Sequence, residues 1–219
     1  MIFVFFYLIL IAIVFFFTIT LIFIPYGFTM YSLVTIFTVP QQILNIARNK
    51  DIRRNHALEH ATSNILEKYA GRTLSISGIA QKNGFIISGL RNPDLIFEAA
   101  QEGLRLLKQG ECYLAIHRRC GTSIAIANFT AAVIFLLILI LTGYFSILSI
   151  IVSLILANML GRYLGTLIQK YFTTSCEVEN MNIVGIEPEF RREAPHDLLL
   201  NHMPDGYFVR TSQDKLIGG

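Results

Sequence analysis

Residues 121–168 read GTSIAIANFTAAVIFLLILILTGYFSILSIIVSLILANMLGRYLGTLI, and this stretch decides the class of fold. No Asp, Glu, Lys or Arg occurs in residues 121–161. Two apolar runs, at 122–142 and 147–168, flank a turn-forming Gly-Tyr-Phe-Ser sequence at 143–146. At about 1.5 Å per residue, each run is long enough to cross the roughly 30 Å hydrocarbon core of a bilayer. The stretch therefore predicts a hairpin of two transmembrane helices.

Four residues inside this hairpin are expected to face protein. Asn128 and Asn158 are polar groups in apolar helices, and such groups seek protein partners, which include each other. Gly161 and Gly165 form a small-xxx-small pair, which suits close approach of two helices.

A second uncharged tract covers residues 1–47. Its first part, 2–24, has no basic start and an apolar run too long for a signal peptide, so we expect a retained transmembrane helix. The Pro-Tyr-Gly sequence at 25–27 is expected to break that helix. Residues 28–47 contain Pro40 and are interpreted as a kinked span, with a helix lying at the membrane interface as the alternative. The chain is thus expected to have three or four transmembrane helices.

The overall composition excludes several classes of protein. Hydrophobic residues make up 53% of the chain and charged residues only 15%, whereas soluble domains carry about 25% charged residues. A soluble globular protein, a disordered chain and a basic nucleic-acid-binding domain are therefore excluded, and the lipid bilayer is the expected partner. The three cysteines, Cys112, Cys120 and Cys176, are an odd number at irregular spacing, which predicts reduced thiols, one of them a metal ligand.

Charge at the membrane junctions predicts the orientation. Residues 48–119 hold 12 Lys and Arg against 7 Asp and Glu, with basic residues crowded at both ends. The positive-inside rule places this segment in the cytoplasm. A helical hairpin returns the chain to the side it left, so the C-terminal tail is expected there too. We therefore expect a protein integral to the bacterial inner membrane or an equivalent internal membrane.

The segment between the uncharged tracts predicts a small α+β insert. Helical periodicity covers 51–69, alternating strands are expected at 72–80 and 85–90, a helix capped by Asn and Pro at 92–109, and a third strand at 111–117. The order is α-β-β-α-β. The expected domains are an N-terminal membrane region, the insert, the hairpin and a cytoplasmic tail, at 1–47, 48–119, 120–170 and 171–219. An extra strand is expected within 176–186, and the rest of the tail is expected to be irregular.

One motif indicates chemistry: His56-Ala57-Leu58-Glu59-His60, in the H-x-x-E-H order of the inverzincins. Histidines at i and i+4 lie one above the other on a helix, so both imidazoles can reach one metal ion. A glutamate beside them can accept a proton from a metal-bound water. The alternative is an ordinary amphipathic helix, because this polar arc lies opposite an apolar stripe of Leu58, Ala61, Ile65 and Tyr69.

A second cluster favours the metal interpretation. His117 and Cys120 are three residues apart, a usual spacing for zinc ligands, and they immediately precede the membrane hairpin. His56 follows the first uncharged tract by nine positions, so both clusters are held near the same membrane surface.

The two motifs together resemble an uncharacterised bacterial integral-membrane family of unknown function. The shared parts are Asn55-His56-Ala57-Leu58-Glu59-His60-Ala61-Thr62 and His117-x-x-Cys120-Gly121-Thr122 before a membrane hairpin, within about 53–168. A second uncharacterised membrane family, predicted to be metal-dependent, is similar in both motifs. The resemblance implies that five residues belong together: His56, Glu59, His60, His117 and Cys120.

Two functions are compatible with this site. In the first, a membrane-embedded zinc-dependent hydrolase, most readily a metallopeptidase acting on membrane proteins or peptides, uses Glu59 as its base. His56 and His60 are then metal ligands, with His117 or Cys120 completing the site, because four tight ligands would close the shell and make the zinc structural. In the second, the protein is a non-catalytic scaffold or assembly factor with a structural metal. A transporter is disfavoured because none of the expected spans carries a charged residue.

Overall fold

The computed structural model describes residues 2–143, 145–190 and 204–213, so parts of the expected tail at 191–203 and 214–219 lie outside the described residues. The chain forms two compact units. The first contains Met1–Gln41 and Ile124–Leu164, and the second contains Gln42–Ser123 and Gly165–Gly219.

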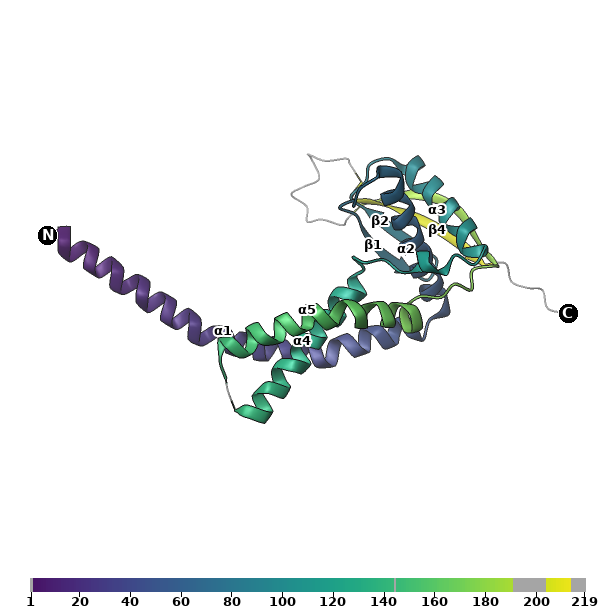
Figure 1. The fold of residues 1–219 in the computed structure, drawn as a ribbon. Helices are drawn as coiled ribbons and strands as arrows, with labels where there is room; N and C mark the ends of the chain where they lie inside the picture. The colour runs from purple at the N-terminus through teal and green to yellow at the C-terminus, as the bar shows by residue number, and fades with distance from the viewer. Residues whose placement is uncertain (1, 144, 191–203, 214–219) are drawn as a thin grey trace. The chain divides into compact units, whose positions relative to one another are not determined.

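The first unit begins with helix α1, Ile2–Ala47, which is continuous over 46 residues (Figure 1). The break expected at 25–27 is therefore wrong, because Pro25 and Pro40 both lie inside the helix. An apolar segment has few alternatives to helical hydrogen bonding, and such segments tolerate a proline that would end a helix in water. The helix is about 69 Å long, more than twice the roughly 30 Å hydrocarbon core.

The two helices expected at 122–142 and 147–168 are confirmed as α4, Gly121–Thr142, and α5, Ile147–Ile168. Close packing at Gly161 is confirmed, since a Cβ placed there would lie 2.8 Å from the Ala127 Cβ. Asn128 and Asn158 are both exposed on their helices, so their expected contact with protein stays a prediction.

Three helices in the described chain are long and apolar enough to cross a membrane. They cover Phe3–Ala47, Gly121–Thr142 and Ile147–Thr173. The chain thus has three candidate spans, the lower of the two numbers expected.

The second unit is built around helix α2, Lys50–Ala70. The Asn49 side chain caps its first turn by accepting a hydrogen bond from the Ile52 amide. Gly71 ends the helix in the left-handed conformation, at φ 62°, which a glycine adopts without strain. The predicted helix at 51–69 is therefore confirmed to within one residue at each end.

A four-stranded antiparallel sheet packs against this helix. The strands are β1, Ser77–Gln81, β2, Gly84–Ser88, β3, Met181–Glu189, and β4, Gly206–Gln213. Their order is β1-β2-β4-β3, so β1 is an edge strand. The predicted hairpin is confirmed as β1 and β2, although the first strand begins at Ser77 and not at 72. The extra strand expected at 176–186 corresponds to β3, which begins at Met181. The expectation of an irregular tail is wrong, because β4 lies in the sheet interior.

Helix α3, Pro93–Lys108, completes the layer over the sheet, and its predicted cap is confirmed by the Asn92 side chain, which accepts from the Leu95 amide. Figure 1 shows α2 and α3 beside the sheet. Both helices share one apolar core with the strands, which includes Leu58, Phe85 and Val209. The unit is therefore a two-layer α+β structure.

The third strand expected at 111–117 is wrong. The segment forms a short 3-10 helix, η1, Cys112–Ala115, alongside α2. The Asn64 side chain donates to the carbonyls of Leu114 and Ile116, at 2.9 and 3.0 Å. These carbonyls are paired with a side chain of α2 and not with a neighbouring strand. Tertiary contacts thus override the local preference for extended backbone.

Candidate metal centre

The two histidines of the H-x-x-E-H motif lie one turn apart on α2, with ring centroids 4.3 Å apart. The Nδ1 of His56 is 2.9 Å from the Thr173 carbonyl, and the Nδ1 of His60 is 2.7 Å from the Ala115 carbonyl. A carbonyl only accepts hydrogen bonds, so each Nδ1 carries the proton and donates it. Each Nε2 therefore presents a lone pair, which is the arrangement that a metal ligand needs.

Cys120 supplies a third donor atom to the same place. Its Sγ lies 3.3 Å from the Nε2 of His56 and also accepts a hydrogen bond from the Thr122 amide. The donor atoms of His56, His60 and Cys120 all lie within 4.8 Å of one another, and all three residues are buried. Two imidazoles and a thiol that converge in this way can hold one metal ion.

One donor atom in this group lacks a partner. The Nε2 of His60 is buried and has no hydrogen-bond partner among the residues that the structure describes. Burial also lowers the pKa of His60 well below its usual value, so its ring is neutral. A buried acceptor without a partner costs about 1–3 kcal/mol. A metal ion bound at this nitrogen removes that cost, so the donor set fits a metal.

Glu59 borders the group without joining it. Its Oε2 lies 3.8 Å from the Nε2 of His56 and 3.7 Å from the Nε2 of His60. Burial raises the pKa of Glu59 to about 8, and the nearby His56 opposes the shift. Gly78 of β1 makes room for the carboxyl group, because a Cβ there would collide with the Glu59 Oε1. The absence of a side chain at Gly78 thus leaves space for the carboxyl group beside the three donors.

His117, the fourth ligand expected from the sequence, lies outside the group of three donors. Its Nε2 is 3.5 Å from the Oε2 of Glu67, and its ring centroid is 6.0 Å from that of His60. The Gln169 side chain also holds the His117 backbone, accepting from its amide at 3.0 Å and donating to its carbonyl at 3.1 Å. The described geometry thus assembles three of the four expected ligands.

The polar face of α2 is buried, and this distinguishes it from an ordinary amphipathic helix. Every residue from Asn55 to Ser63 is buried. Tyr69, by contrast, is 52% exposed, so its expected place in the apolar stripe is wrong. A helix that only needed one apolar face would turn its histidines and glutamate toward solvent.

Sequence reasoning missed the groups that orient the histidines. Thr173 lies in η2, Gln169–Thr173, a π-helix that continues α5, and Ala115 ends η1. Both residues contact the histidines through backbone carbonyls, so the identities of their side chains give no sequence signal. Gly78 did carry one, since a glycine inside a strand often marks a close approach of another group.

Comparison with known proteins gives a family without a known activity. A protein of Picosynechococcus sp. described as uncharacterized is 38% identical over 84 residues, which cover 34% of this chain and 40% of that relative. The match therefore spans less than half of the relative's length. No solved structure matches the chain. A family described as a domain of unknown function, DUF6391, matches residues 51–186, more than half of the chain. The expectation of an uncharacterised family is confirmed, and the chain belongs to the DUF6391 family.

Proposed function

We propose that this protein is a membrane-embedded zinc-dependent hydrolase of the metallopeptidase class. One observation carries the proposal: three convergent donors, His56, His60 and Cys120, lie beside a carboxyl group that is not one of them. Catalytic zinc sites have three protein ligands and one open position, whereas structural sites have four. The place of His117 beside Glu67 supports a three-ligand site.

Zinc is the metal that best suits this donor set, because imidazole and thiolate together favour it. When bound, zinc lowers the pKa of a water ligand to about 7 and so supplies a nucleophile near neutral pH.

The protein's own residues have separate tasks. The Thr173 and Ala115 carbonyls hold the two imidazole rings in the required tautomer. Glu59 is close enough to both Nε2 atoms to take a proton from water at the centre and pass it to the leaving amine. A nearby cation favours the charged form of a carboxyl group and so lowers its pKa. A bound metal would therefore oppose the increase in the pKa of Glu59 that burial causes.

Burial supports a second candidate, a scaffold with a structural metal. Exposure is 7% for His56 and Cys120 and 0% for His60, so little of the centre is open to a substrate. In that function the metal would hold α2 to the Cys120 segment, and Glu59 would only support the ligands.

We also propose that residues 48–119 lie on the cytoplasmic side of the membrane, on the strength of the basic residues at its junctions. A cysteine introduced at Lys82 in a cysteine-free variant should resist an impermeant reagent in intact cells. Labelling from outside would contradict this orientation.

The substitution Glu59→Gln separates the two functions. It keeps the size of the side chain but removes the base, so a hydrolase should keep its zinc and lose about 10²–10⁴-fold in turnover. Because the substrate is unidentified, the readout is the membrane proteome of cells carrying wild-type, E59Q or deletion alleles. A hydrolase predicts the same uncleaved precursors in E59Q and deletion cells.

The matched control is Glu67→Gln, two turns further along α2, which should leave the proteome unchanged. If E59Q protein binds zinc normally and fully complements the deletion, the hydrolase proposal is wrong and the scaffold function stands.

A further inference from the structure

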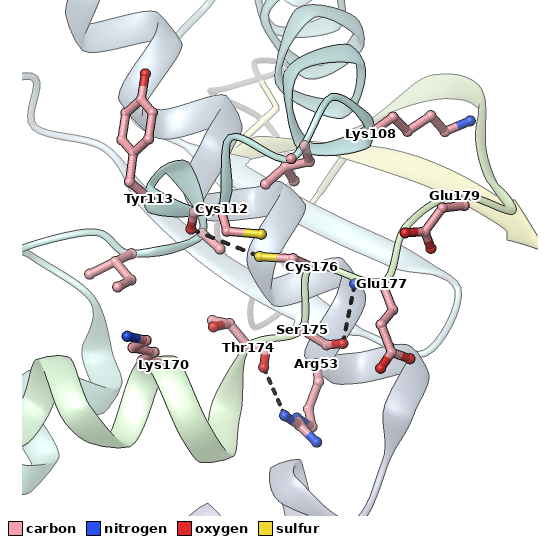
Figure 2. A pocket seen from close by; sticks show the side chains of 14 residues that line it. Arg53, Lys108, Cys112, Tyr113, Lys170, Thr174, Ser175, Cys176, Glu177 and Glu179 are labelled. Atoms are coloured by element: carbon pink, nitrogen blue, oxygen red, sulfur yellow. Dashed lines mark hydrogen bonds between the residues drawn. The ribbon is translucent and has the colours of Figure 1, made fainter.

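Two further cysteines lie close to each other in the fold. They belong to the backbone segments that hold the histidines of the metal centre. Cys112 begins η1 and is exposed, and Cys176 lies three residues after the end of η2. Figure 2 shows their sulfur atoms turned toward one another. The Cys176 Sγ lies 3.9 Å from the Cys112 carbonyl oxygen, although 64 positions separate the two residues. Both are free thiols.

We propose that Cys112 and Cys176 are a redox site that forms a reversible disulfide, and that this bond stabilises the metal centre. The first part stands on the geometry of the two thiols alone. The second part rests on the proposed function, since it requires a bound metal.

The connection to the metal centre runs through two carbonyl groups. Ala115, three residues after Cys112, accepts the hydrogen bond of His60, and Thr173, three residues before Cys176, accepts that of His56. A disulfide would join the two backbone segments that fix both imidazole rings. Groups that orient metal ligands change metal affinity by about 10–100-fold when they are lost. Restraining these segments should therefore slow the release of the metal.

The surroundings allow a small reagent to reach the sulfur atoms. Both cysteines line a cavity of about 720 Å³ that also includes the side chains of Lys108, Lys170 and Glu179. Figure 2 shows this cavity with the two thiols at its wall. Burial, and to a lesser degree Cys112, raises the pKa of Cys176 to about 12. Cys112 is exposed whereas Cys176 is only partly exposed, so Cys112 is the thiol that reacts first, and Cys176 resolves the intermediate.

The oxidant is a small-molecule disulfide such as glutathione disulfide. The Cys112 thiolate attacks one of its sulfur atoms, the S–S bond breaks, and one glutathione thiolate leaves and takes up a proton. The Cys176 thiolate then attacks the Cys112 sulfur of the mixed disulfide and displaces the second glutathione. Two protein thiols lose two protons and two electrons, and one glutathione disulfide becomes two glutathione thiols.

The first test uses the full chain in detergent, equilibrated in buffers of graded glutathione to glutathione disulfide ratio. Alkylation, digestion and mass spectrometry then count the free thiols. The expected product is a single bond between Cys112 and Cys176, with Cys120 still free because it is buried. Cys176→Ser should stop at a mixed disulfide on Cys112. Absence of the bond at every ratio, or a bond that includes Cys120, overturns the proposal.

The second test measures the loss of zinc to a chelator from the oxidised and reduced forms. We expect release about tenfold slower from the oxidised wild type, within the range for groups that orient ligands. In Cys112→Ser the oxidant should change nothing. Equal release from both wild-type forms overturns the link to the metal centre. If no zinc binds at all, the proposed function fails, whereas the thiol count still decides whether the disulfide forms.

Discussion

The second unit contains two buried polar clusters that differ in how completely they are hydrogen bonded. Gln169 uses both ends of its side chain, pairing with the amide and carbonyl of His117 and with the Ser123 hydroxyl. In the metal centre, the Nε2 of His60 has no partner within the described residues, and burial raises the pKa of Glu59 to about 8.

This difference distinguishes polar groups that stabilise the fold from polar groups that are available to bind a ligand. A satisfied buried amide such as Gln169 is explained by folding alone. A buried nitrogen without a partner and a carboxyl group forced toward its neutral form both destabilise the folded chain. Such groups are retained where they bind or react with something, and three different changes test that distinction.

The largest effect on stability is expected from Gln169→Leu. The apolar side chain fills a similar volume but leaves the His117 amide and the Ser123 hydroxyl without the Gln169 partner. We expect the free energy of unfolding to fall by about 3 kcal/mol, which corresponds to a fall in Tm of about 6–12 °C in detergent. The control is Gln101→Leu on the exposed face of α3, which should leave Tm nearly unchanged. A stable Q169L protein would show that the cluster does not hold the fold.

A second effect is a pH dependence that belongs to Glu59 alone. In the metal-free protein, Glu59 keeps its proton up to a pKa of about 8, whereas in the unfolded chain it releases it near 4.5. Between these values the folded state binds more protons, so stability falls as pH rises. The lowered pKa of His60 acts in the opposite direction, but only below its usual value of 6.5.

The window for measuring this is therefore pH 6.5 to 8, with metal removed by a chelator. Across this pH range, the free energy of unfolding of the wild-type protein should fall by about 2 kcal/mol, at about 1.4 kcal/mol per pH unit. Glu59→Gln cannot titrate and should show a flat profile. An equal slope in both proteins would mean that Glu59 has an ordinary pKa in the folded chain.

The smallest effect is expected from Gly78→Ala. Alanine normally stabilises a strand relative to glycine by roughly 0.5–1 kcal/mol. At Gly78 the new Cβ would collide with the Glu59 Oε1 and displace the carboxyl group. We therefore expect the free energy of unfolding to fall by about 1 kcal/mol. The matched control is Gly185→Ala in β3, where nothing lies within 4 Å of an added Cβ. A G78A protein that is more stable than wild type would place Glu59 elsewhere.

The parts of the molecule that could be predicted from sequence are those governed by local rules. The caps Asn49 and Gly71 and the period of α2 act within a few residues, so this helix and the convergence of His56 and His60 follow from the sequence. The apolar length of α4 and α5 is equally local.

The parts that could not be predicted depend on distant segments. Segment 111–117 has a strand-like pattern, but Asn64 pairs with its carbonyls and it folds as η1. The tyrosine, phenylalanine and valine at 207–209 are typical of a strand, but the pairing of β4 with β2 joins distant segments of the chain. Pro25 is a reliable helix breaker in water, and the rule fails in an apolar segment.

The central claim is that His56, His60 and Cys120 bind one zinc ion that has an open coordination position. It is tested most directly by measuring the metal content and the X-ray absorption spectrum of the wild-type protein purified in detergent. We expect one zinc per chain, coordinated by two imidazole nitrogens, one sulfur and one further light atom. His117→Ala should leave the spectrum unchanged, whereas His56→Ala/His60→Ala should lose the metal. A wild-type protein that holds no more zinc than the double variant would contradict the claim.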